Sequence, residues 1–339
     1  MARYPLGRRM GRPRNWIRII LPLLIIAAVI AFIYGRGYFS EKKKQTPAVP
    51  KEVNVPEVSQ TILPAPPRQT PEPNLLKIPE PTAASNPQVD ELTAEAMGLI
   101  GEKPGRIIDA RDRLSEILPM PMSNQQRAFV KNQLSALADK WLFSRSVFPV
   151  DKICSGYKVN PGEQLRTIAR QFKVPYEILM QINNIPRPEA LQAGETIKVI
   201  NGPFHARVYR STFTMDLYLQ STFVRSFPVG LGKPGMETPI GLWVVKPGGK
   251  LIKPIWTDPV SGKTYHPESP DYPLGSRWIG LQGIKGQAKD RTGFAIHGTQ
   301  KPEEIGTPGS QGCIRLHNGD AILVYNLLEP GFSQVEVVE

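Results

Sequence analysis

The sequence predicts a multidomain α+β protein with a helical membrane anchor at its N-terminus and a β-rich domain at its C-terminus. Three observations support this class. The chain has 339 residues, which is long enough for two or three domains. An uncharged apolar segment is followed by a proline-rich stretch that separates it from the rest of the chain. Further on, the pattern predicts a Pro-rich linker, a helical hairpin, a small βααβ module and then alternating strands.

The first 35 residues combine a basic tail with an apolar segment. Residues 1–44 contain seven Arg and three Lys against Glu41, so they hold most of the net charge of +12. Residues 1–18 are expected to form a cytoplasmic basic tail, because positive residues flank the cytoplasmic end of membrane helices. Residues 19–35 are expected to form a transmembrane anchor, since a helix over 19–34 rises about 24 Å and flanking residues extend it. A cleaved signal peptide is the alternative, but no A-x-A site follows the segment.

The remaining composition excludes other classes of protein. The basic charge is concentrated in the tail, and no stripe of basic and aromatic residues occurs elsewhere, so no nucleic-acid partner is expected. Four histidines and two cysteines form no CxxC, HExxH or clustered set, so no metal and no cofactor are expected. We expect Cys313 to be a free thiol and Cys154 to be a buried one, although an intermolecular bridge through Cys154 stays open.

Residues 36–88 are predicted to form a Pro-rich linker, and residues 89–150 a helical region. Eleven prolines between residues 45 and 88 favour an extended chain that reaches on the order of 100 Å. In the helical region, apolar residues recur at helical spacing over residues 107–118 and again after Ser123, a predicted N-cap. The two stretches predict a small helical hairpin, whose role the sequence does not indicate.

Residues 156–200 have the pattern of a compact βααβ module. A short strand and a Pro-Gly turn precede two apolar helical faces, and a second turn leads into a closing strand. The run Y-x-V-x-P-G-x-x-L-x-x-I-A and the later run L-x-x-G-x-x-I-x-V resemble a LysM domain over nearly its whole length. The resemblance implies binding to N-acetylglucosamine-containing glycans such as peptidoglycan. It places the glycan groove in two loops, with these candidate residues: Asn160, Pro161, Gly162, Glu163, Ile185, Pro186 and Arg187.

Residues 203–339 are predicted to form the β-rich domain. Residues 213–220 alternate apolar and polar side chains as a half-buried strand does, and residues 223–229 predict another strand. Residues 246–276 are rich in Pro, Gly, Asp and Ser, and we expect them to form a long excursion that acts as a lid or a substrate wall.

One Gly-rich stretch of this domain brings together His297, Cys313 and Arg315. A thiolate is a strong nucleophile, and a nearby imidazole can generate it at neutral pH. The guanidinium group offers a fixed fork of donors for a carboxylate or a peptide carbonyl. A glycine at position 312 lets a substrate approach the backbone, where N–H groups around the cysteine could bind a developing oxyanion.

The order HGT…IG…S-x-G-C-I-R-L, with T-P-x-G at residues 238–241, resembles the L,D-transpeptidase (YkuD) family. The resemblance implies a β-rich, sandwich-like catalytic domain that acts on peptidoglycan stem peptides. It implies that Cys313 is the nucleophile, that His297 is the general base and that Arg315 orients the substrate. The expected substrate and oxyanion residues are Gly298, Ser310, Gln311 and Gly312. Many members carry a second histidine where this chain has Gln311. His317, just past the motif, ranks below His297, because the family motif places the base in HGT.

The resemblance therefore implies a membrane-anchored bacterial L,D-transpeptidase of peptidoglycan biosynthesis, with a part in cell-wall structure and cell shape. Cys313 would form a thioester with a tetrapeptide stem, release D-Ala and transfer the acyl group to an amine, giving a 3→3 cross-link or a protein tether. The catalytic domain would face the periplasm or cell wall, with the LysM domain on peptidoglycan. The alternatives are an L,D-carboxypeptidase, a sortase-like transpeptidase and a non-enzymatic tethered wall-binding protein. The acceptor and the oligomeric state stay open.

Overall fold

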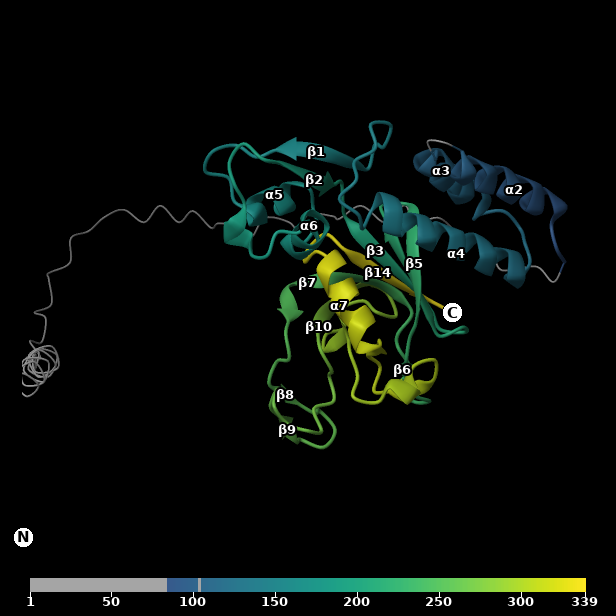
Figure 1. Ribbon diagram of the computed structural model, residues 1–339. Helices are drawn as coiled ribbons and strands as arrows, with labels where there is room; N and C mark the ends of the chain where they lie inside the picture. The colour runs from purple at the N-terminus through teal and green to yellow at the C-terminus, as the bar shows by residue number, and fades with distance from the viewer. Residues whose placement is uncertain (1–83, 103–104) are drawn as a thin grey trace, which may run out of the picture. The chain divides into compact units, whose positions relative to one another are not determined.

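The computed structural model describes residues 84–102 and 105–339 (Figure 1). These residues lie in one compact unit of the chain, Arg68–Glu339. The predicted basic tail and transmembrane anchor, and the linker as far as residue 83, fall outside the described residues. Within the described part of the chain, no helix has the length and apolar character needed to cross a membrane.

Three helices come first: α2 (Pro87–Gly101), α3 (Ile107–Ile117) and α4 (Asn124–Trp141). As predicted, Ser123 caps α4, because its side chain accepts a hydrogen bond from the Gln126 N–H in a reciprocal capping box. The predicted hairpin is wrong in one respect, since α2 adds a third helix and begins at Pro87, inside the predicted linker. Val89 and Ala96 of α2 are buried two turns apart, and this apolar face packs α2 against its neighbours.

The LysM prediction of a βααβ module agrees with the structure. Its elements are β1 (Cys154–Lys158), α5 (Leu165–Gln171), α6 (Tyr176–Asn183), the short 3-10 helix η1 (Pro188–Ala190) and β2 (Thr196–Ile200). Strands β1 and β2 pair antiparallel. Helix α6 is followed by its C-cap Asn184, which takes the left-handed conformation that stops a helix, with φ of 57°. The side chain of Asn183 ties α6 to β2 through hydrogen bonds with the backbone of Lys198.

Lys198 joins this module to the end of α4. Its side chain is 1% exposed, and its ammonium group donates to the carbonyl oxygens of Trp141 and Ser144. Burial lowers the pKa of this amine, so the two carbonyl acceptors are what make a buried ammonium group tolerable.

The C-terminal domain is built on an eight-stranded mixed sheet in the order β13-β11-β10-β7-β14-β3-β4-β5. The strands of this sheet are β3 (Phe204–Tyr209), β4 (Thr214–Leu219), β5 (Thr222–Pro228), β7 (Gly241–Leu251), β10 (Trp278–Gly286), β11 (Phe294–His297), β13 (Ile314–Arg315) and β14 (Gln334–Val338). The alternation predicted over residues 213–220 produces β4, and the strand predicted over 223–229 is β5. Helix α7 (Asn318–Leu327) packs against β10 and β11.

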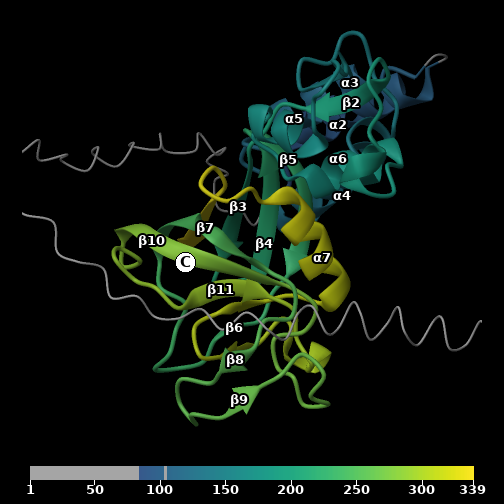
Figure 2. The same ribbon diagram turned by 90° about the vertical axis from the view of Figure 1, so that its left-hand side faces the viewer.

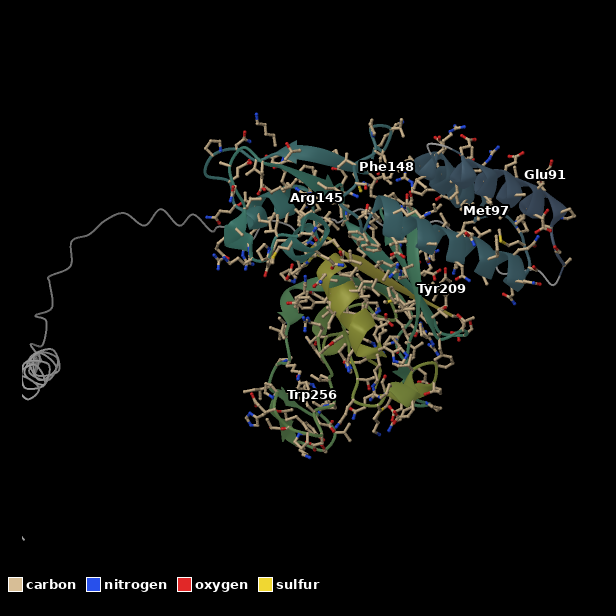
Figure 3. All side chains as sticks on the ribbon, viewed as in Figure 1. Glu91, Met97, Arg145, Phe148, Tyr209 and Trp256 are labelled. Carbon is tan, nitrogen blue, oxygen red and sulfur yellow. The ribbon has the colours of Figure 1, made fainter. Side chains whose placement is uncertain are left out.

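The excursion predicted over residues 246–276 begins later than expected, because β7 continues to Leu251. Beyond it lies a small hairpin of β8 (Trp256–Thr257) and β9 (Thr264–Tyr265), which extends away from the sheet (Figure 2). The rings of Trp256 and Tyr265 stack with centroids 5.9 Å apart, and Trp256 is labelled on the hairpin in Figure 3. Two short strands, β6 (Leu231–Gly232) and β12 (Pro308–Ser310), pair in parallel beside the sheet.

Helix α4 packs on the edge strand β5 of the sheet. The Lys131 ammonium group donates to the Asp216 carboxylate at 2.6 Å, and this carboxylate is fully buried. Asp216 also accepts from the Tyr218 and Ser226 hydroxyls, at 3.2 and 2.7 Å. A buried carboxylate is stable only when such donors surround it. The helical region therefore contributes a charge that the core of the C-terminal sheet requires.

Candidate active site

His297 is the last residue of β11, and the sheet fixes its surroundings. It pairs with Trp278 of β10 on one side and, in parallel register, with Arg315 of β13 on the other. Side chains of paired residues project from the same face of a sheet. The Trp278 indole stacks on the imidazole with centroids 5.6 Å apart and an interplanar angle of 17°. The imidazole therefore lies against the Trp278 indole, and Arg315 is its neighbour on the adjacent strand.

The electrostatics of His297 keep its ring neutral. The side chain is 5% exposed, and burial lowers its pKa to about 4, with the Arg315 charge acting in the same direction. Its Nδ1 lies 2.6 Å from the Gly298 carbonyl oxygen. Since a carbonyl only accepts, Nδ1 carries the proton, and Nε2 is the nitrogen left as a base at neutral pH.

A tight turn before β13 presents Cys313. The Ser310 hydroxyl accepts from the Gly312 N–H at 3.1 Å and donates to the Cys313 carbonyl at 2.6 Å. Gly312 has φ of +111°, and a Cβ added there would lie 2.7 Å from the Phe294 ring. Only glycine suits this position, because of both its conformation and the close approach of Phe294. Ser310 is 1% exposed, so its hydroxyl stabilises the turn from within.

The Cys313 thiol is partly accessible, in contrast to the buried imidazole. Its sulfur lies 4.0 Å from the Gly293 carbonyl oxygen. Burial raises the pKa of this thiol to about 11, against the opposing effects of the Ala295 N–H and the Arg315 charge. The Gly312 N–H is already bonded to Ser310, whereas the Cys313 N–H has no hydrogen-bond partner among the described residues. Of the two, the Cys313 N–H is the donor that is free to bind a developing oxyanion.

Arg315 is held from two sides. Its backbone N–H and C=O both pair with Gly230, at 2.8 and 3.0 Å. Its guanidinium group donates to the carboxylate of Glu304, which also accepts from Lys301 at 3.0 Å. Glu304 ends the 3-10 helix η2 (Pro302–Glu304). Glu304 thus fixes the guanidinium group of Arg315. The positive charge of Arg315 still acts to lower the pKa of both His297 and Cys313.

Asn318, at the start of α7, orders the chain around the histidine. Its side chain accepts from the Ser276 N–H at 2.9 Å and donates to the Thr299 carbonyl at 2.8 Å. A Cβ added to Gly298 would lie 2.2 Å from the Asn318 side-chain oxygen. Gly298 therefore serves this packing, because a larger residue would push Asn318 away from the loop that follows His297.

Gln311 is exposed and faces the excursion. Its side-chain amide donates to the Asp258 carboxylate at 3.3 Å, and Gln300 donates to the Pro270 carbonyl from the other end of the motif. Two parts of the excursion, residues 258 and 270, therefore contact the motif. These contacts show that part of the excursion lies beside the motif, and its role as a lid or a substrate wall stays a prediction.

The candidate glycan residues of the LysM domain fall into two groups. Tyr157 and the Asn160 N–H both donate to the Glu163 carboxylate at 2.8 Å, so Glu163 stabilises its own turn, which also contains Pro161 and Gly162. The second group lies in the loop after α6 and consists of Ile185, Pro186 and Arg187. These residues line a cavity of about 700 Å³, and residues of α6 and Asn326 of α7 complete its walls. That cavity is not lined by any residue of the 160–163 turn.

The structure brings Cys313, His297 and Arg315 to one end of β11 and β13. Sequence reasoning gave no role to Glu304, Asn318 or Trp278. Two of them carried a signal: Glu304 is an acid within the same stretch as Arg315, and Trp278 lies in a segment, residues 277–281, that resembles the family strand leading toward the pocket. In the residues that the structure describes, no group of three His, Cys, Asp or Glu side chains is placed to hold a metal ion.

Comparisons with known proteins agree with this architecture. Residues 203–337 match the model of the L,D-transpeptidase catalytic domain, YkuD, and residues 157–199 match the LysM domain. The chain is 28% identical to the putative L,D-transpeptidase YkuD of Bacillus licheniformis over 182 residues, covering 52% of this chain and 94% of that protein. It is 40% identical to the putative L,D-transpeptidase YqjB of Bacillus subtilis over 124 residues, covering 37% and 65% of the two chains.

Among solved structures, the chain is similar to the NMR structure of the catalytic domain of the E. faecium L,D-transpeptidase. The TM-score is 0.31 and the identity 24%, over 40% of this chain and 95% of that one. The family matches rest on sequence and do not depend on this likeness. They show that the chain carries a YkuD-type L,D-transpeptidase catalytic domain preceded by a LysM domain. Members of this family are cysteine-dependent acyltransferases.

Proposed function

We propose that this protein is a peptidoglycan L,D-transpeptidase in which Cys313 is the nucleophile and His297 the general base. The observation that carries the proposal is the parallel pairing of β11 with β13. It sets the buried imidazole beside Arg315, two residues after the accessible thiol, in a domain that matches the L,D-transpeptidase family. The substrate is a tetrapeptide stem of peptidoglycan, and Arg315 orients it.

Burial raises the pKa of the Cys313 thiol and lowers the pKa of the His297 imidazole, which favours the neutral form of both groups before substrate binds. In the proposed first step, the thiol proton moves to Nε2 of His297 as the sulfur attacks the acyl carbonyl. The Cys313 N–H donates to the oxyanion of the tetrahedral intermediate.

The intermediate collapses when the C–N bond to the terminal D-Ala breaks. His297 returns its proton to the departing amine, which leaves as D-Ala, and the acyl group remains on sulfur as a thioester. An acceptor amine then attacks the thioester carbonyl and gives its proton to His297, and the proton returns to the thiolate as it leaves. The product is a new amide, either a 3→3 cross-link or a tether to a protein. Water in place of the amine gives an L,D-carboxypeptidase.

The other parts of the chain fit a substrate that is an extended polymer. The LysM domain holds the enzyme on peptidoglycan, the N-terminal apolar segment anchors it in the bacterial membrane, and the proline-rich segment lets it reach the wall. The catalytic domain then works on the outer side of the membrane.

Intact-mass spectrometry of the protein with a disaccharide-tetrapeptide tests the proposal. We expect a mass increase equal to the disaccharide-tripeptide acyl group and release of D-Ala, both absent in Cys313→Ala, with Cys154→Ala as the matched control that retains both. Adding an amine acceptor separates transfer from hydrolysis, because only transfer consumes the amine. A folded protein with a reduced thiol that forms no adduct and releases no D-Ala would instead be a tethered wall-binding protein.

A further inference from the structure

The excursion, residues 252–276, leaves the sheet and returns to it on neighbouring strands. Lys250 lies near the end of β7, just before the excursion, and Arg277 follows it, just before β10. Strands β7 and β10 pair with each other, and Trp278, the first residue of β10, stacks on the His297 imidazole. The contacts that hold the two ends of the excursion therefore lie next to the residue that packs on the proposed general base.

Both ends of the excursion rest on helix α7. The Lys250 ammonium group lies 4.2 Å from the centroid of the Tyr325 ring, and the Arg277 guanidinium group lies 5.4 Å from it. Tyr325 is 8% exposed, so both cations meet the ring in a place largely closed to water, where such attraction is strongest. At the start of the same helix, Asn318 binds Ser276 through its side chain and its carbonyl oxygen.

The acid that pairs with Lys250 comes from the LysM domain. The Glu177 carboxylate of α6 lies 3.8 Å from the Lys250 ammonium group, whose side chain is 9% exposed. Burial lowers the pKa of this amine, and the charges of Glu177 and Glu329 act against that shift. Since a neighbouring negative charge favours the charged form of a buried amine, the LysM domain helps to keep Lys250 on the Tyr325 ring as a cation.

Glu177 also faces the cavity of the LysM domain. It lines the cavity of about 700 Å³ beside the loop after α6, and with Lys250 and Tyr325 it lines a smaller one of about 260 Å³. The Glu177 side chain is 23% exposed, so water still reaches the ion pair. A ligand that fills the larger cavity would exclude this water, and opposite charges attract more strongly where water is excluded. Occupation of the LysM cavity would therefore strengthen the pair.

We propose that Glu177 and Lys250 are positioning residues, through which an N-acetylglucosamine oligosaccharide bound in the LysM cavity fixes the excursion and speeds acylation of Cys313. The inference rests on the proposed acyl transfer, and it makes the LysM domain a regulator of that transfer as well as a tether. The two states differ in whether the ends of the excursion are held on Tyr325 or released. The ligand favours the held state, because it shields the ion pair from water.

The test measures acylation of Cys313 in the full-length protein in detergent, by intact-mass spectrometry, with and without excess chitohexaose. The donor is a tetrapeptide that carries no sugar, so chitohexaose is the sole saccharide present. We expect chitohexaose to raise the wild-type rate about fivefold. Glu177→Gln and Lys250→Met should both lose this response, and the double variant should behave like either single variant, because all three lack the same pair.

The matched control is Glu189→Gln. It makes the same charge change as Glu177→Gln at an exposed LysM residue that lines neither cavity, and it should keep the response. Hydrogen exchange of the amides of residues 252–276 gives a second readout that needs no acyl transfer. Chitohexaose should slow this exchange in the wild type and in the control. In Glu177→Gln and Lys250→Met the exchange should be faster than in the wild type and insensitive to the sugar.

The outcomes separate this inference from the transpeptidase proposal. Chitohexaose that changes neither the wild-type rate nor the exchange overturns the coupling, and so does a full response in both pair variants; acylation itself would still stand. Loss of the response in Glu177→Gln with a full response in Lys250→Met also overturns it, because Glu177 would then act only in binding the sugar. Exchange that follows the expected pattern without any acylation would support the coupling and refute the transpeptidase proposal.

Discussion

The two cysteines of the chain have thiols that are similar in acidity and different in surroundings. Burial raises the pKa of Cys154 to about 12 and that of Cys313 to about 11. Cys154 is 1% exposed and lies in β1, where it pairs with Ile200 of β2. Cys313 is partly accessible, on a glycine turn beside Arg315 and the end of β11. A raised pKa therefore does not distinguish the two thiols. Accessibility and the neighbouring motif residues do, and on those grounds Cys313 is the proposed nucleophile.

The largest expected difference between Cys313 and Cys154 is their rate of alkylation in the native protein. At pH 9, iodoacetamide should modify Cys313 at least about 100 times faster than Cys154, because Cys154 reacts only when its strand opens. Peptide mapping after a timed reaction measures both sites in one sample, and reaction in denaturant, where both sites should label, is the control. Comparable native rates at the two sites would remove the distinction between them.

The turn that presents Cys313 should tolerate substitution poorly. Gly312→Ala adds a Cβ 2.7 Å from the Phe294 ring at a φ of +111°, which we expect to cost about 1–3 kcal/mol of the free energy of unfolding. Urea unfolding measures this cost. Gly319→Ala is the matched control, since nothing lies within 4 Å of its added Cβ and α7 favours alanine. Equal stability of the two variants would show that the turn is not strained.

The raised pKa values predict that the protein loses stability in alkaline solution. An unfolded thiol with a pKa of 9.0 releases its proton before the folded Cys154 with a pKa of about 12, so the unfolded state binds fewer protons as pH rises above 9. At pH 10 this loss is about 1 kcal/mol from Cys154, and Cys313, with a pKa of about 11, contributes nearly as much, because pH 10 lies below both folded pKa values. Urea unfolding at pH 8 and pH 10 should show a shallower decline in Cys154→Ala and in Cys313→Ala than in the wild-type protein. A decline as steep as that of the wild type in either variant would contradict the burial of that thiol.

The smallest effect concerns the acid that holds Arg315. Glu304→Gln removes the negative partner of a guanidinium group whose charge lowers the pKa of the Cys313 thiol. We therefore expect alkylation of Cys313 at pH 8 to become about two- to threefold faster. Glu303→Gln makes the same charge change at the adjacent exposed position and should leave the rate unaltered. A slower rate in Glu304→Gln would mean that Arg315 needs Glu304 to remain beside the thiol.

The local residue pattern by itself determined much of this protein. Alternation over residues 213–220 is sufficient to predict β4, and the capping residue Ser123 marks the start of α4. The βααβ order of the LysM domain and the HGT…GCIRL motif are likewise continuous in sequence, and the family matches confirm the two domains that contain them. Such features depend on residues within a few positions of one another, which is the range over which backbone propensity and side-chain spacing act.

Tertiary structure decided which of these residues are free to act. The Gly312 N–H is used by Ser310, and the Arg315 guanidinium is bound by Glu304. Asn318 orders the loop after His297 by reaching Ser276, 42 positions away. The Asp216 carboxylate is buried because Lys131 arrives from α4, 85 positions earlier. No periodicity relates residues so far apart, because their contacts depend on how the strands are ordered in the sheet. The sequence could name the chemical groups of the site, and only the folded sheet determined their partners, their burial and therefore their pKa values.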